Sequence, residues 1–189
     1  MNHPLQPIRD YFLDSFRKSI AEARSEFDQF TTELLLEIPS FKHPDYCYRL
    51  YRADIVGKRD GKSEIREITL GEREVSDWQS IVPAGMSIDA PMVWYGIEFD
   101  VVGAPPDEPA LLDWASRWMD ISDSRYDESA EFQQAVHSVT PPRITESGFT
   151  LSVDFGSAPT DAFDELAELL ARDTRRVSVG SFFLFRSAT

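Results

Sequence analysis

Cysteine and histidine are scarce in this chain of 189 residues, and their scarcity excludes several kinds of site. Cys47 is the only cysteine, so an intramolecular disulfide and a cysteine-based zinc site are excluded, as is usual for proteins of reducing compartments. The three histidines, His3, His43 and His137, show no spacing typical of metal ligands. We interpret Cys47 and His137 as structural residues.

Long apolar runs and familiar catalytic motifs are also missing. The longest apolar runs, residues 34–36 and 182–185, are too short to cross a bilayer. The first residues show neither an apolar core nor a cleavage signature, so we expect no signal peptide and a cytoplasmic protein. The chain contains no Walker loop and no Gly-x-Gly-x-x-Gly, and Ser181 lacks the Gly-x-Ser-x-Gly elbow. We therefore expect no cofactor and lean against an enzyme.

Basic residues are few relative to acidic ones. Nineteen Lys and Arg face 33 Asp and Glu, which gives a formal net charge of −14. Such a charge repels nucleic acid and anionic membranes, and it attracts basic proteins and speeds their association. Solubility alone is the competing explanation for the acidity.

The first part of the chain predicts a long helix followed by a hairpin. From Pro7 to Leu36, apolar residues recur at steps of three and four, which indicates one buried helical face. The residues of this stripe are Phe12, Phe16, Ile20, Ala23, Phe27, Phe30 and Leu34. Residues 46–56 and 65–70 then predict paired strands, with a tight turn at Asp60 and Gly61. The basic residues of this hairpin are expected to pair with nearby acids, and a short helix is expected over residues 76–81.

The second half contains an internal repeat. Residues 97–107 align without gaps with residues 151–161, at an offset of 54 residues. Asp100 matches Asp154, Ala104 matches Ala158, and Asp107 matches Asp161. Each copy indicates a strand, an Ala-Pro turn and a helix that begins with acidic residues, which complement the helix dipole.

Two such units predict a β-α-β-β-α-β order, which resembles the ferredoxin-like split arrangement. The expected strands are residues 93–102, 133–140, 146–155 and 176–185, and the expected helices are 108–119 and 161–172. Residues 126–136 are alternatively helical. The prediction is thus a single α+β domain over residues 1–189, with a ferredoxin-like core at about 92–186 and the N-terminal helix and hairpin of residues 1–71 packed on it.

Three carboxylates form a candidate metal or catalytic site. Alternation along the strands puts Glu98 and Asp100 on one polar face, and Asp154 on the matching face of the repeat. In the split arrangement we expect the strands that begin near Val93 and Glu146 to be parallel neighbours, so these side chains meet and can bind a divalent cation or share a proton. The alternative is that each aspartate merely ends its strand before a turn.

A second candidate surface is the acidic segment of residues 120–131. It lacks the glycine and the spacing of a calcium loop, so it is either a solvated loop or a contact surface in which an aromatic residue serves as an anchor. The contact residues that we expect here are Asp120, Asp123, Tyr126, Asp127 and Glu128, together with Trp94.

The sequence thus favours a non-catalytic module that binds a basic protein, of which an immunity-type inhibitor of a basic toxin or enzyme is the most concrete form. One alternative is a metal-dependent enzyme or small-ligand binder that uses Asp100, Asp154 and Glu98. Another is a nucleic-acid mimic, whose carboxylates imitate phosphates.

Overall fold

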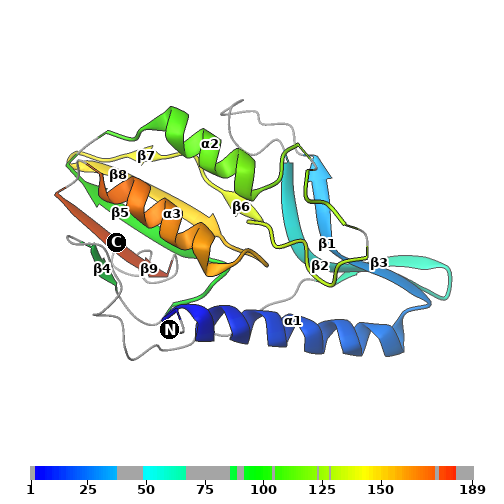
Figure 1. Cartoon of the computed structure of the whole chain (residues 1–189). Helices are drawn as coiled ribbons and strands as arrows, with labels where there is room; N and C mark the ends of the chain where they lie inside the picture. Colours follow the sequence, from blue (N-terminus) through cyan, green and yellow to red (C-terminus); the bar gives the residue numbers. More distant parts are fainter. Residues whose placement is uncertain are drawn as a thin grey trace.

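The computed structural model describes residues 3–37, 49–66, 86–88, 92–103, 105–122, 124–127, 129–172 and 175–181, and the side chains within these ranges except at 34–37, 49–54 and 181. The described residues form a mixed α+β structure with three helices and two sheets (Figure 1). One sheet has three strands in the order β1-β2-β3, and the other has six, of which five follow the order β4-β9-β5-β8-β6 while β7 pairs with β8. The elements are α1 (Gln6–Glu26), β1 (Gln29–Glu37), β2 (Arg49–Arg59), β3 (Lys62–Arg66), β4 (Met86–Ile88), β5 (Ile97–Val102), α2 (Glu108–Trp118), β6 (Ser138–Val139), β7 (Arg143–Ile144), β8 (Gly148–Asp154), α3 (Thr160–Ala171) and β9 (Arg176–Ser181).

The predicted N-terminal helix is correct for its first two thirds and wrong beyond them. Pro7 lies in the first turn of α1, and Ile8, Phe12, Phe16 and Ala23 are buried along one face. Residues 29–37 form strand β1, which pairs with β2 in antiparallel register. Apolar residues at short spacings satisfy either a helix face or one side of a strand, and the pairing with β2 selects the strand.

The predicted hairpin is present as β2 and β3. Asp60 and Gly61 form its turn with φ values of 51° and 74°, the left-handed conformation that a two-residue turn requires. Arg59 bonds Glu64 of the neighbouring strand at 2.9 Å, as the expected pairing within the hairpin predicts, whereas Arg66 bonds Glu26 of α1 at 2.6 Å, a partner outside the hairpin. The helix predicted over residues 76–81 lies outside the described residues.

The six-stranded sheet corrects one central expectation. Strands β5 and β8 are neighbours, as predicted, but they are antiparallel, and β9 is antiparallel to β5 on its other side. The chain thus passes from β5 through α2 to β6, and from β8 through α3 to β9, and each connection skips one strand. Both helices lie over the same face of the sheet (Figure 1). The predicted bounds of α2 and α3 agree with the structure to within one residue.

The main core lies between this sheet and its helices. Ile97, Phe99 and Val101 of β5 are buried together with Phe149, Leu151 and Val153 of β8, as their alternation predicts. Trp94 also belongs to this core and is only 1% exposed, so its side chain does not lie on the surface. No helix within the described ranges is both long and apolar enough to cross a membrane.

A long connection joins α2 to β6. Its described residues, within 119–137, contain neither the expected strand from residue 133 nor the alternative helix over 126–136; only Ser138 and Val139 are extended in the sheet. Connections of this length without regular structure are uncommon in compact domains and are often functional.

Candidate functional site

The antiparallel pairing separates the three predicted carboxylates. Asp100 is opposite Thr150, whereas Asp154 lies beyond Val153, the partner of Ile97. Asp154 is four residues along β8 from Thr150, which corresponds to roughly 13 Å of extended strand. Glu98 instead accepts a hydrogen bond from the Ser152 hydroxyl at 3.1 Å. No cluster of three or more His, Cys, Asp or Glu within the described ranges is able to hold a metal ion, and the structure does not bring Glu98, Asp100 and Asp154 together.

Asp154 contributes instead to a buried charge cluster around His137. The His137 Nε2 lies 3.1 Å from Glu33 Oε1, and its Nδ1 lies 3.7 Å from Asp154 Oδ2. The side chains of His137 and Glu33 are only 1% and 3% exposed. Ser157 adds a hydroxyl that donates to Glu33 Oε1. We call these four residues, Glu33, His137, Asp154 and Ser157, the histidine cluster.

The histidine cluster holds a positive charge in the protein interior. Burial by itself lowers the pKa of His137, but the negative charges of Asp154 and Glu33, together with the hydrogen bond to Glu33, outweigh burial and raise that pKa to about 9. His137 is therefore an imidazolium at neutral pH, and both of its nitrogens carry protons. Such an ion between two carboxylates is held by charge pairing that replaces the lost hydration.

Two backbone residues at the histidine cluster have left-handed conformations. Glu33 has φ of 51° at the point where the β1–β2 register shifts, and its Oε2 accepts the Gln133 amide at 2.9 Å. Gly156 has φ of 49°, and a Cβ there would lie 2.1 Å from the His137 ring. Both conformations are costly for ordinary residues, so the surrounding contacts hold them in place.

The histidine cluster is not arranged for nucleophilic catalysis. The Ser157 hydroxyl donates to Glu33 and accepts the Ala135 amide at 3.2 Å, so its proton is directed toward a carboxylate and away from the imidazole. An imidazolium has no free lone pair with which to accept that proton. The geometry instead fastens three distant segments together: β1, the end of the connection, and the turn after β8.

Arg9 of α1 fastens the same end of the connection from outside the cluster. Its Nε donates to the Ala158 carbonyl at 2.6 Å, and its Nη2 donates to the Ser157 carbonyl and to Gln134 Oε1, each at 2.9 Å. Gln134 has φ of 55°, a conformation that needs such support. The end of the connection is thus tied to both α1 and the turn after β8.

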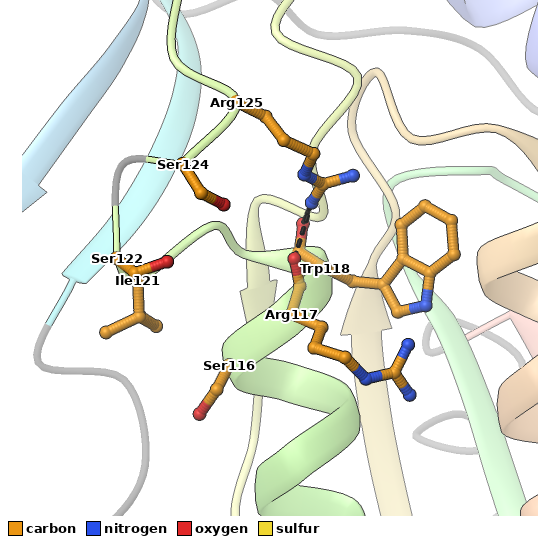
Figure 2. Close-up of a pocket in the computed structure, with 7 residues that line it drawn as sticks. All are labelled: Ser116, Arg117, Trp118, Ile121, Ser122, Ser124 and Arg125. Carbon is orange, nitrogen blue, oxygen red and sulfur yellow. Dashed lines mark hydrogen bonds between the residues drawn. The ribbon is translucent and has the colours of Figure 1, made fainter.

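The beginning of the connection is held by a second charged group. Asp120, also with φ near 50°, is 3% exposed, and its carboxylate accepts the Ser124 hydroxyl at 2.8 Å and the Arg125 amide at 2.9 Å. The Arg125 guanidinium donates to the carbonyls of Arg117 and Trp118 at the end of α2. It also lies 5.2 Å from the Trp118 ring centre. Figure 2 shows this guanidinium directed at the end of the helix beside the indole.

A pocket of about 560 Å³ adjoins this turn. It is lined by Ser116, Arg117, Trp118, Ile121, Ser122, Ser124 and Arg125 (Figure 2). A second hollow of about 390 Å³ lies between α2 and α3, and acidic Asp113, Glu165 and Glu168 are part of its lining. Arg117 borders both and bonds Asp113 at 3.1 Å and Glu165 at 2.9 Å.

The middle of the connection faces outward. Tyr126 is 47% exposed, and Asp127, Ser129, Ala130 and Glu131 are exposed beside it. Asp127 organises its own turn by accepting the Ser129 amide at 2.8 Å, and the amide and hydroxyl of Ser129 hold the pKa of Asp127 below its usual range. Of the predicted contact residues, Tyr126 and Asp127 therefore lie on the surface, whereas Asp120 and Trp94 are buried. Asp123 and Glu128 lie outside the described residues.

Sequence reasoning missed Glu33, Ser157, Arg9 and Arg125. Glu33 fell inside a predicted helix, and nothing in the sequence marks the bulge that turns it inward. A signal did exist for Arg125, because it is the only basic residue within 120–131 and so has several acidic neighbours to pair with. No protein-family model matches this chain, and no curated protein or solved structure matches it either.

Proposed function

We propose that this protein is a non-catalytic binding module that contacts a basic protein through the 119–137 connection. One observation carries the proposal: the connection is fastened at both ends by buried charged residues, yet it presents Tyr126 and acidic side chains to solvent between them. Fastened loops with an exposed aromatic residue lose little entropy when they bind a partner.

Charge supports a basic partner. The arginines around the connection are committed to groups of the chain itself: Arg17 bonds Glu131 at 3.1 Å, Arg117 bonds Asp113 and Glu165, and Arg125 bonds the end of α2. The acidic residues outnumber the basic ones, and the resulting net charge of −14 attracts positively charged proteins over a long range. A positively charged surface approaching this protein is therefore accelerated electrostatically.

An immunity-type inhibitor of a basic toxin or enzyme is the most specific form of this proposal. Such a role needs a rigid acidic surface and no chemistry, and the histidine cluster supplies rigidity without a free nucleophile. The single cysteine suits a reducing cytoplasm, where we propose that the protein acts. The order β9-β5-β8-β6 and the two skipped-strand connections support our classification of the core as ferredoxin-like.

Site-specific photo-crosslinking tests the proposal. A photoreactive phenylalanine analogue is placed at Tyr126 and, as a matched control, at Ile144, an apolar residue of β7 that is 66% exposed. We expect the probe at 126 to capture a basic protein from the native lysate, with a yield that falls as salt is added, and the probe at 144 to leave that protein uncaptured. Equal capture at both positions, or capture at 126 only of acidic proteins irrespective of salt, would show that the connection is not an electrostatic contact surface.

A further inference from the structure

The turn at the start of the connection contains a buried carboxylate, that of Asp120, which Arg125 contacts. Asp120 is a non-glycine residue in the left-handed conformation, which costs roughly 1 kcal/mol or more. Its carboxylate is also buried, so it requires donors in place of water. The Arg125 amide is one of these donors, and the Arg125 Nε lies 3.9 Å from Asp120 Oδ1, close enough to offset the buried negative charge.

The same guanidinium completes the end of α2. The last carbonyls of a helix have no donors within the helix, and Arg125 reaches back to two of them, those of Arg117 and Trp118. A cation at this end also interacts favourably with the helix dipole. The guanidinium carbon also lies 5.2 Å from the centre of the Trp118 ring, within the range of a cation–π contact, and Figure 2 shows the guanidinium beside the indole. Arg125 therefore supports the turn, the helix end and one wall of the 560 Å³ pocket.

We propose that Arg125 is the positioning residue of the contact surface: it fixes Asp120 and the start of the connection against α2 so that Tyr126, the next residue, is presented outward in one arrangement. This inference rests on the proposed function for the identity of the surface, whereas the fastening itself is independent of any partner. Lysine cannot replace arginine here, because the guanidinium reaches the two carbonyls with Nη2 while its Nε lies beside Asp120, and an ammonium is a single point donor.

Amide hydrogen exchange of the isolated protein tests the fastening. We expect Arg125→Ala to accelerate exchange of the backbone amides of residues 121 and 125 by about tenfold. Losing the hydrogen bonds from the charged guanidinium favours local opening of the turn. Arg125→Lys should behave like the alanine variant. Arg117→Ala is the matched control: it removes an arginine of the same pocket but retains the carbonyl to which Arg125 donates. Unchanged exchange in both Arg125 variants, or equal acceleration in Arg117→Ala, would overturn the inference.

Binding to the protein captured by the crosslinker then separates this inference from the proposed function. We expect Tyr126→Ala and Arg125→Lys each to weaken binding by about tenfold, since a loosened loop must be ordered again when it binds. Weaker binding for Tyr126→Ala alone would overturn the positioning role and leave the proposed function intact. No loss with either variant would overturn the contact surface itself.

Discussion

Glu33 and His137 are 104 residues apart in the sequence and meet in the protein interior, with Oε1 and Nε2 separated by 3.1 Å. Their contact joins the three-stranded sheet to the end of the connection that precedes β6. This contact also makes the stability of the fold depend on pH, because the pKa of His137 is raised only in the folded state.

The free energy of unfolding should fall as the solution becomes alkaline. The pKa of His137 is raised to about 9 from an ordinary value of 6.5, so its contribution is complete below about pH 6.5 and is lost as the pH rises through about 9. The loss should be on the order of 3 kcal/mol. Urea denaturation across this range measures it. Glu33→Gln removes one of the charges that raise this pKa, so the loss should still begin near pH 6.5 but should be smaller and end at a lower pH. A flat profile in the native chain would contradict a buried imidazolium.

Arg9 should matter far more to stability than another arginine of the same helix. Arg9→Met leaves the carbonyls of Ser157 and Ala158 without their donor and should reduce the free energy of unfolding by about 2 kcal/mol. Arg17→Met removes exposed pairs with Asp14 and Glu131 and should cost about 1 kcal/mol or less. Chemical denaturation of both variants compares them, and equal losses would mean that Arg9 does not fasten the connection.

Two glycines with left-handed backbone should respond differently to alanine. A methyl group at Gly156 meets the buried His137 ring, whereas one at Gly61 has nothing within 4 Å. Gly61→Ala should therefore cost about 1 kcal/mol from backbone strain alone. Gly156→Ala should cost several times as much, because the ring must move out of the histidine cluster. Melting temperatures of the two variants show the difference, and similar shifts would indicate that the ring has room to adjust.

Divalent cations should not stabilise the protein. Asp100 and Asp154 lie at different positions along the β5–β8 pair, and Glu98 is bonded to Ser152. Thermal melts with magnesium, manganese or calcium at roughly millimolar concentration should match melts at equal ionic strength without them, since only a ligand bound to the folded state raises the melting temperature. A rise with one cation that Asp100→Asn abolishes would restore the metal hypothesis.

The internal repeat predicts some features of the fold correctly but leaves the relative direction of its two strands undetermined. It correctly predicts the bounds of α2 and α3 and the adjacency of β5 and β8. It does not give their relative direction, because the same spacing arises whether two copies run in parallel or are related by a twofold axis. The antiparallel register places Glu98 directly opposite Ser152, its own equivalent in the repeat. Equivalent residues away from that point must diverge, so Asp100 and Asp154 are separated.

Long-range pairing explains the other differences. Residues 29–37 contain apolar residues at spacings that suit either a helix or a strand, and only β2 decides between them. The histidine cluster joins residues from β1, the connection and the turn after β8, so no local pattern announces it. Tyr126 and Asp127 were predictable as surface residues because the acidic composition of their segment predicts exposure to solvent. Asp120 belongs to the same segment but is buried by its local turn.

We propose that the connection steers a basic partner by its negative charge. Asp127→Asn tests it with Asp60→Asn as the control, because both remove one negative charge and Asp60 lies outside the connection, at the β2–β3 turn. The decisive measurement is the rate constant for association with the captured protein, taken from roughly 0.05 M to roughly 0.5 M salt. We expect association to slow as salt is added, and Asp127→Asn to slow it more than Asp60→Asn at low salt. Rates that are indifferent to salt and equal in the two variants would contradict it.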